Sequence, residues 1–431
     1  MFSQMFGSFL VEKGVIDKAK LEAIIKEQSE AKLKLGTIAI SEKLLTQAQA
    51  DEINHLQTQM DKRFGDIAVE KKMLTEEQVK NLLSKQGNVF LKFVQLLAEK
   101  TDLTVDDISE RVAEFQKEKG FSDSEMTSLK RDDVDAIVPI LAFSAKPYVT
   151  ELVGLVLRNM IRFVTSNFHI GRIKHVSSVP YAFMAGQSVF GDHRIHLGFC
   201  TNGEGDGICR LASLYSGFEI TELAGDAADA IGEFANINNG LLATNLSEKH
   251  KIDLDMEPPF TYANETAEGD AYVIPLFVEG KELSLYIAVD SDAVVGKNPV
   301  SFETTKGDTT VKEGSKGRVV IVDDSTMIRK MLRAMLEEEG YSVVAEAANG
   351  LEAVEAYKAN KPDIISLDIT MPKMDGLEAL GKIKEFDPDA NAIMVTAAGQ
   401  QQKVIEALKL GANKFIMKPF TKDEVVKGFI I

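Results

Sequence analysis

The segment GRVVIVDDSTMIRKML, residues 317–332, decides the fold of the C-terminal part of this 431-residue chain. A short apolar run ends in Asp323 and Asp324, and an amphipathic helix-like stretch follows. The same alternation continues to the last residue, with YSVVAEAA, DIISLD, AIMVTAA and KFIMKPF as the later apolar runs. Continuous apolar strands that alternate with helices are typical of a parallel sheet buried on both faces. Residues 317–431 therefore predict a (βα)5 doubly wound α/β domain.

Polar residues stand where these strands end, at the edge where open α/β sheets build their sites. They are Asp323, Asp324, Asp368, Thr396 and Lys418. Three carboxylates at one edge repel each other unless a cation relieves them, and ligands made only of oxygen favour Mg²⁺. With Asp323 and Asp324 on the metal, Asp368 is left as a nucleophile toward phosphorus. Lys418 and Thr396 are then placed to stabilise the phosphoryl oxygens.

The motifs VDDS, LDITMPKMDG and KPF resemble those of the response-regulator receiver family. The resemblance implies that Asp368 is the phosphoacceptor and that a sensor histidine kinase supplies the phosphoryl group. It implies a Mg²⁺ site made of Asp324, Asp368, Asp323 through water, and the backbone of Thr370.

Two further features follow from the same resemblance. The family carries a cis peptide at the position of Lys418-Pro419, and its switch pairs Thr396 with an aromatic residue, here Phe415. Phenylalanine in place of the commoner tyrosine removes a hydroxyl, so we expect a purely hydrophobic switch.

The middle of the chain combines strand-like runs with a long helical stretch, which predicts an α+β domain over residues 146–293. On that stretch Glu233 and Asn236 are three residues apart and share one helix face. A carboxylate can hold a partner's lysine, and a carboxamide can aim a water at phosphorus without acting as a strong base. Polar pairs at this spacing are also common on plain solvent-exposed helix faces.

The run AADAIGEFANINNGLLATNLSEKHKIDLDMEPPF, residues 227–260, resembles the core of the CheX-type chemotaxis phosphatases. That family removes phosphate from CheY-like receivers with an ExxN motif on a long helix. The resemblance implies that Glu233 pairs with a receiver lysine and that Asn236 orients the attacking water. It also suggests a homodimer formed through this domain.

The first 86 residues contain three 24-residue blocks at a 29-residue period, Met5–Gln28, Lys34–Gln57 and Arg63–Gln86. Asp17, Thr46 and Thr75 stand where a second helix should begin in each block, which predicts stacked helical repeats. The pattern resembles MshEN domains, which bind cyclic di-GMP, and the resemblance suggests nucleotide-binding residues Lys34, Gly36, Arg63 and Gly65. A helical stack that only contacts protein explains the same pattern.

Composition limits the partners. The net charge of −17 argues against nucleic acid, whose phosphates require a basic surface. Neither an apolar run long enough to span a membrane nor a secretory signal is evident, and two cysteines make no disulfide framework, so we expect a cytoplasmic protein. The expected organisation is helical repeats at 1–90, a helical linker at 91–145, the CheX-like domain at 146–293, a flexible linker at 294–316 and the receiver at 317–431.

Two functions remain open on this reading. In the first, the chain is an enzyme of two-component or chemotaxis signalling, a protein aspartyl-phosphate phosphatase that acts on its own or on a separate receiver. In the second, it is a non-catalytic response-regulator adaptor, whose partner binding is controlled by phosphorylation of Asp368 and by cyclic di-GMP.

Overall fold

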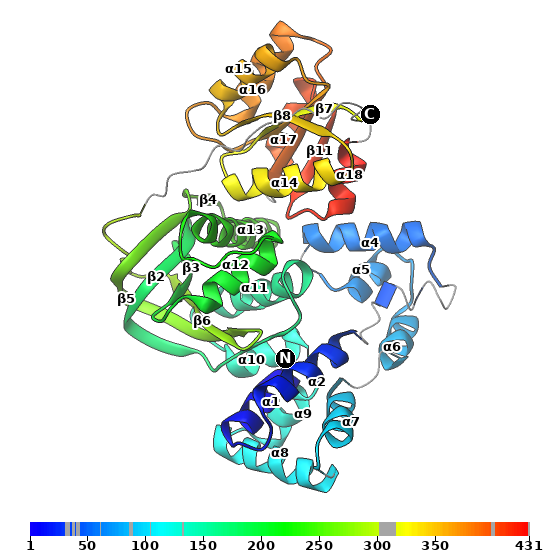
Figure 1. The fold of residues 1–431 in the computed structure, drawn as a ribbon, viewed down its shortest axis with the longest axis vertical. Coiled ribbons are helices and arrows are strands. Elements are labelled where there is room, and N and C mark those ends of the chain that lie inside the picture. Colours follow the sequence, from blue (N-terminus) through cyan, green and yellow to red (C-terminus); the bar gives the residue numbers. More distant parts are fainter. Residues whose placement is uncertain are drawn as a thin grey trace. The chain divides into compact units, whose positions relative to one another are not determined.

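The computed structural model of the chain (Figure 1) describes residues 1–30, 35–36, 39, 44–60, 62–85, 89–103, 105–131, 133–300, 316–397 and 401–429. Lys34 and most of the expected 294–316 linker lie outside the described residues. The chain forms two compact units. The first unit comprises Met1–Ala182, His193–Leu211 and Asn264–Gly296, and the second comprises Phe183–Asp192, Ala212–Ala263 and Lys297–Ile431.

The N-terminal part of the first unit is helical. Its helices are α1 (Phe2–Glu12), α2 (Lys18–Glu30), α4 (Gln47–Met60), α5 (Phe64–Glu70), α6 (Glu76–Lys85), α7 (Val89–Lys100), α8 (Val105–Lys119), α9 (Asp123–Leu129), α10 (Val134–Leu141) and α11 (Val149–Phe163). The capping predictions are confirmed, since the side chains of Asp17, Thr46 and Thr75 each accept a hydrogen bond from the backbone N–H three residues later. These bonds satisfy N–H groups that a helix leaves free at its start.

A cluster of phenylalanines forms the core of these helices. Phe6 of α1 packs edge-on against Phe93 of α7 and Phe115 of α8, and all three side chains are fully buried. Residues 91–145, interpreted from the sequence as a linker, thus supply two of the largest buried side chains of this region. Burial of aromatic rings of this size is among the largest contributions to a core.

A six-stranded sheet follows α11, with the order β1-β5-β6-β3-β2-β4. Its strands are β1 (Phe168–Ile170), β2 (Lys174–Gly191), β3 (Ile195–Thr201), β4 (Leu254–Met256), β5 (Phe260–Val278) and β6 (Lys281–Val289). Strands β5 and β6 are joined by a two-residue hairpin turn at Glu279-Gly280, since Val278 pairs with Lys281 and both turn residues have positive φ, 48° and 74°. A type I′ hairpin turn requires positive φ at both central residues, a conformation that glycine adopts without strain.

Two helices accompany this sheet. Helix α12 spans Asp206–Ser216, and α13 spans Gly225–His250. In the second unit α13 passes close to the end of β4, where a Cβ on Gly232 would lie 3.0 Å from the Pro259 ring. Any side chain at this position would crowd Pro259, so Gly232 lets the chain after β4 pack closely against α13 beside Glu233.

The C-terminal part of the second unit is a five-stranded parallel sheet of order β11-β10-β9-β7-β8, as the sequence predicts. The strands are β7 (Arg318–Val322), β8 (Ser342–Ala347), β9 (Ile364–Asp368), β10 (Ala392–Ala397) and β11 (Lys414–Lys418). The helices are α14 (Thr326–Glu338), α15 (Gly350–Asn360), α16 (Gly376–Phe386), α17 (Gln401–Lys409) and α18 (Lys422–Phe429). Helix α14 packs against α18, and α16 packs against both α15 and α17 (Figure 1).

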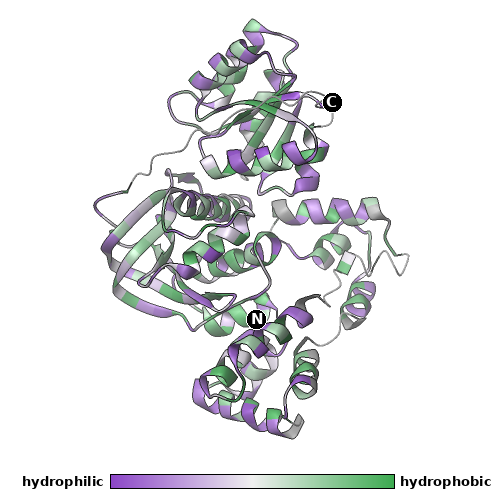
Figure 2. Ribbon diagram, in the orientation of Figure 1, coloured by the Kyte–Doolittle hydropathy of each residue, from purple (hydrophilic) through white to green (hydrophobic). Residues whose placement is uncertain are grey.

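The hydropathy of this sheet agrees with burial on both faces. Figure 2 shows its strands as hydrophobic and the surrounding helices as mixed. The strand residues Val320, Ile365 and Met394 are fully buried. Within the described ranges, no helix combines the length and the apolar composition needed to cross a membrane.

Candidate active site

The carboxyl ends of the parallel strands bring together a set of charged residues, which we call the strand-end cluster: Asp323, Asp324, Asp368 and Lys418. Asp323 and Asp324 follow β7, Asp368 ends β9 and Lys418 ends β11. One carboxylate oxygen from each aspartate lies within 4.8 Å of the other two. Parallel strands in register place their carboxyl ends side by side, so residues 45 positions apart in sequence meet here.

Lys418 is the cation of this cluster. Its Nζ lies 2.8 Å from Asp323 Oδ2 and donates a hydrogen bond of 3.0 Å to Asp368 Oδ2. Burial alone would lower the pKa of Lys418, but the charges of Asp323, Asp368 and Glu233 hold this pKa well above its usual value. The lysine therefore stays charged at every physiological pH.

One ammonium does not balance three carboxylates. Desolvation and the charge of Asp368 raise the pKa of Asp324 to about 6, although its side chain is exposed, and burial raises the pKa of Asp323 well above its usual value. The raised pKa values reflect carboxylates that repel each other because the fold holds them close together. A divalent cation would relieve this repulsion. Three aspartate oxygens within 4.8 Å and no nitrogen or sulfur ligand among them fit Mg²⁺.

The remaining receiver residues occupy the expected strands. Thr396 lies near the end of β10 with a buried side chain, and Thr370 lies in the loop after β9. Phe415, on β11, keeps 44% of its surface exposed. The cis peptide expected at Lys418-Pro419 is confirmed.

Glu233 and Asn236 lie on α13, which belongs to the same unit as the strand-end cluster. Glu233 is 5% exposed, and its Oε1 lies 3.8 Å from Lys418 Nζ. Burial raises the pKa of Glu233 to about 7, with Lys418 acting to lower it and Asp368 to raise it. The side chain is therefore poised between its neutral and charged forms near neutral pH.

The carboxamide of Asn236 is held from two sides. Its Oδ1 accepts a 2.9 Å hydrogen bond from Gln187 Nε2, and its Nδ2 donates to Glu233 Oε2 at 3.4 Å. Gln187 Nε2 also donates to the carbonyl of Glu257 at 2.9 Å. These bonds fix the amide's orientation, with its oxygen toward Gln187 and its nitrogen toward Glu233.

Sequence reasoning missed two residues of this site, Gln187 and Asp229. Gln187 lies on β2 and is 2% exposed. The sequence feature that could have identified it is a polar residue inside an apolar strand run. Asp229 lies one turn before Glu233 on α13, and its carboxylate accepts hydrogen bonds from the backbone N–H of Met327 and from Ser325 Oγ. Its signal was the four-residue spacing to Glu233, which places both carboxylates on one helix face.

In the N-terminal repeats, the glycines expected to contact a nucleotide lie against side chains of the protein instead. A Cβ on Gly65 would lie 2.7 Å from Val79 Cγ1, and one on Gly36 would lie 3.1 Å from the Phe64 ring. Both glycines therefore permit close packing of repeat helices. Lys34 lies outside the described residues.

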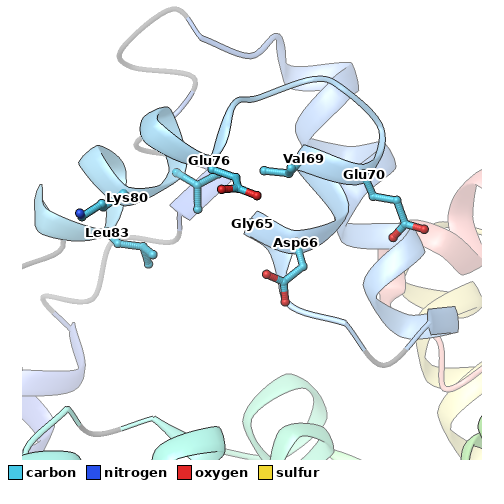
Figure 3. Close-up of a pocket in the computed structure, with 8 residues that line it drawn as sticks. Gly65, Asp66, Val69, Glu70, Glu76, Lys80 and Leu83 are labelled. Carbon is cyan, nitrogen blue, oxygen red and sulfur yellow. The ribbon is translucent and has the colours of Figure 1, made fainter.

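Arg63 is paired with acidic residues. Its guanidinium lies 2.8 Å from Asp66 and 3.5 Å from Asp135. A pocket of about 450 Å³ lies between α5 and α6, which we call the repeat pocket (Figure 3). Its lining residues are Gly65, Asp66, Val69, Glu70, Glu76, Val79, Lys80 and Leu83. Three carboxylates against one lysine make this pocket a poor receptor for a phosphate.

Comparison with known proteins assigns both halves of the site to signalling families. A family model described as the response regulator receiver domain matches residues 319–429, and one described as the CheC-like family matches residues 227–262. The chemotaxis protein CheY of Bacillus subtilis (strain 168) is 50% identical over 111 residues, which are 26% of this chain and 92% of that protein. The CheY of Thermotoga maritima is 52% identical over 111 residues, with the same two shares.

Among solved structures, a chain of the CheX-CheY-BeF3-Mg complex from Borrelia burgdorferi is 44% identical in the aligned part. The alignment covers 26% of this chain and 87% of that one, with a TM-score of 0.26. The receiver match and the CheC-like match fall on the strand-end cluster and on α13, respectively.

Proposed function

Because the chain belongs to the response regulator receiver family through residues 319–429, we propose that Asp368 is its phosphoacceptor and that Glu233 and Asn236 catalyse hydrolysis of a receiver aspartyl phosphate. The chain is a two-component, chemotaxis-type signalling protein with a CheY-like receiver and a CheC-like region. The phosphatase reaction is the finer step that we propose. In this proposal a sensor histidine kinase supplies the phosphoryl group in the cytoplasm.

The observation that carries the proposal is the position of Lys418 between the two sites. Its ammonium lies 3.0 Å from the Asp368 carboxylate and 3.8 Å from that of Glu233. A carboxylate that reaches a receiver's buried lysine is held next to the residue that carries the phosphoryl group. Asn236, one helical turn beyond Glu233, is thereby brought toward the same end of the sheet.

Phosphorylation forms one bond and breaks another. A carboxylate oxygen of Asp368 attacks phosphorus, and the bond between phosphorus and the donor's nitrogen breaks, with the electron pair going to that nitrogen. Lys418 stabilises the charge on the phosphoryl oxygens through its ammonium. A Mg²⁺ held by Asp324, Asp368 and the Thr370 backbone, and by Asp323 through water, would neutralise further charge on these oxygens.

Hydrolysis reverses the attachment with water as the nucleophile. A water oxygen bonds to phosphorus, the bond from phosphorus to the Asp368 oxygen breaks, and the electron pair restores the carboxylate. The water proton leaves with the inorganic phosphate or to solvent. Asn236 orients the water through its carboxamide, which Gln187 holds in one orientation. Glu233 keeps the helix at the lysine, so catalysis is chiefly positioning.

The test is the lifetime of phosphate on the purified full-length protein, loaded with a small phosphodonor and Mg²⁺. We expect Asn236→Ala to lengthen this lifetime by roughly ten- to a hundred-fold, the loss that follows misplacement of a reacting group. The matched control is Asn360→Ala, which removes an asparagine whose amide donates to Ala356 within its own helix. This control should decay like wild type.

Equal lifetimes for wild type and Asn236→Ala, on this chain and on an added phosphorylated receiver, would contradict the phosphatase. The chain would then act as an adaptor controlled by phosphorylation. Dimerisation through the central domain stays a prediction that this proposal does not require. Binding of cyclic di-GMP is not required either, and the pairing of Arg63 with Asp66 and Asp135 disfavours it.

A further inference from the structure

Four polar residues of α13 form a single stripe, Asp226, Asp229, Glu233 and Asn236, at intervals of three, four and three residues. Such spacing places them on one face of the helix. The first three contact the receiver of the same chain, within the second unit. Glu233 reaches Lys418, Asp229 reaches the start of α14, and Asp226 Oδ1 lies 2.7 Å from Lys330 Nζ.

Asp229 makes the most specific of these contacts. Helix α14 begins after Ser325, whose side chain caps the N–H of Ile328. The N–H of Met327 is another donor that the helix leaves free, and the Asp229 carboxylate accepts its hydrogen bond together with one of 3.2 Å from Ser325 Oγ. A carboxylate at this point also meets the positive end of the helix dipole. The Asp229 side chain is half-buried, so it is only partly accessible to water.

Asp226 adds a contact that depends on the identity of the receiver. The backbone N–H that Asp229 uses is present in any receiver helix, whereas Lys330 is a side chain that another receiver need not carry. The Asp226–Lys330 pair is half-exposed, with exposed fractions of 51% and 33%, so its effect on affinity is small. Together the two aspartates combine one general contact with one selective contact.

We propose that the receiver of the same polypeptide is the substrate of the Glu233–Asn236 site, and that Asp229 and Asp226 are the positioning residues that select it. The inference rests on the phosphatase function proposed above and names its substrate. The stripe holds α13 across the end of the sheet where Asp368 carries its phosphate. Hydrolysis is then intramolecular, and its rate does not depend on protein concentration.

The decisive experiment mixes two full-length variants. Asn236→Ala accepts phosphate but lacks the water-orienting amide, whereas Asp368→Asn keeps that amide but accepts no phosphate. Labelled phosphate is loaded onto Asn236→Ala with a small phosphodonor and Mg²⁺, the donor is removed, and an equimolar amount of Asp368→Asn is added. We expect no acceleration, because the phosphatase face of the second protein is covered by its own receiver.

Wild type is measured in parallel over a hundred-fold dilution, where we expect a short lifetime that does not change. Acceleration of Asn236→Ala to the wild-type rate on mixing, or slowing of wild type on dilution, would overturn the intramolecular proposal while leaving the phosphatase intact. A wild-type lifetime as long as that of Asn236→Ala at every concentration, with no effect on an added phosphorylated receiver, would overturn the phosphatase and this proposal with it.

A charge exchange tests the selecting role. Asp226→Lys should lengthen the wild-type phosphate lifetime by roughly two- to five-fold, the scale of a half-exposed ion pair, and Lys330→Asp should do the same. The double variant with both changes restores the pair with its charges exchanged and should recover most of the loss. The matched control is Asp206→Lys, which breaks an exposed ion pair with Lys281 at the start of α12 in the first unit and should leave the lifetime unchanged.

No loss in the single variants, or a loss that the double variant fails to recover, would overturn the selecting role of Asp226. Asp229→Asn is the second test. It keeps the shape but removes the charge at the start of α14, and should lengthen the lifetime more than either single charge change. A lifetime equal to that of wild type would overturn the role of Asp229.

Discussion

The strand-end cluster and the repeat pocket each contain three carboxylates and one lysine, but they differ in how these charges are arranged. In the cluster, one ammonium faces three aspartates, and the pKa of Asp324 is raised to about 6. Beside the repeat pocket, the cation that sequence reasoning selected, Arg63, already lies between Asp66 and Asp135. Three converging carboxylates attract a divalent cation, and such a cation together with Lys418 would hold a phosphoryl group. The paired Arg63 offers a phosphate no comparable partner beside the repeat pocket.

The largest expected effect is on the acceptor. Asp368→Asn removes the nucleophilic oxygen, and we expect incorporation of phosphate from a small phosphodonor to fall to background. The measurement is acid-stable or gel-retained label on the full-length protein. Asp389→Asn makes the same change at an exposed position after α16 and should incorporate label like wild type. Label that persists on Asp368→Asn would mean that another residue accepts the phosphoryl group. The strand-end cluster would then have no advantage over the repeat pocket as the phosphate site.

The next effect concerns Glu233, whose pKa is raised from 4.5 to about 7 mainly by burial. A carboxyl that is easier to protonate when folded favours folding at low pH, and this contribution is lost as the pH rises from about 4.5 to about 7. Glu233→Gln stays neutral, so it should unfold at the same temperature as wild type near pH 4.5 and at a higher temperature at pH 8. The difference at pH 8 should be on the order of a few kcal/mol.

Thermal unfolding of the full-length proteins at both pH values checks this expectation. Glu248→Gln changes an exposed glutamate on the same helix and serves as the control. A difference between wild type and Glu233→Gln that is the same at both pH values would contradict the burial of a titrating carboxyl at Lys418. It would also mean that less negative charge is concentrated around Lys418 than the contrast with the repeat pocket assumes.

A smaller effect tests the packing role of Gly65. Gly65→Ala places a methyl group 2.7 Å from Val79 Cγ1, and we expect a loss of about 1–3 kcal/mol in the stability of the repeat helices. Adding Val79→Ala removes the obstructing methyl groups and should recover part of that loss. Gly381→Ala, on α16 with open space around it, should be neutral or slightly stabilising. Circular dichroism during thermal unfolding measures the stability of all three variants. A Gly65→Ala variant as stable as wild type would contradict the packing role and leave contact with a ligand as the explanation of this glycine.

These differences also explain which parts of the fold and of the site could be predicted from the sequence alone. The receiver was predictable because its functional residues directly follow strands whose apolar runs are visible, and parallel strands bring their ends together. Gln187 and Asp229 were not, because their partners Asn236 and Met327 are 49 and 98 residues away and the contacts exist only in the folded chain.

Glycine was ambiguous for a different reason. The repeats place Gly7, Gly36 and Gly65 at equivalent positions, and such a residue serves the approach of a ligand or of another helix equally well. Only the neighbours of its missing Cβ separate the two roles. At all three positions those neighbours are side chains of the protein, Leu21, Phe64 and Val79.

The smallest expected effect is at Arg63. Its ion pairs with Asp66 and Asp135 are largely exposed, so Arg63→Ala should change the stability of the repeats by less than about 1 kcal/mol. The guanidinium is already paired, and the repeat pocket is lined by three carboxylates. We therefore expect labelled cyclic di-GMP to show no saturable binding to the full-length protein at tens of micromolar. A weak specific complex with a binding free energy of roughly 6–7 kcal/mol would be detected at this concentration. Saturable binding that Arg63→Ala abolishes and Lys80→Ala leaves intact would reverse this expectation. It would mean that a nucleotide's phosphates displace Asp66 and Asp135 from the arginine, so that paired charge can still serve as a binding site.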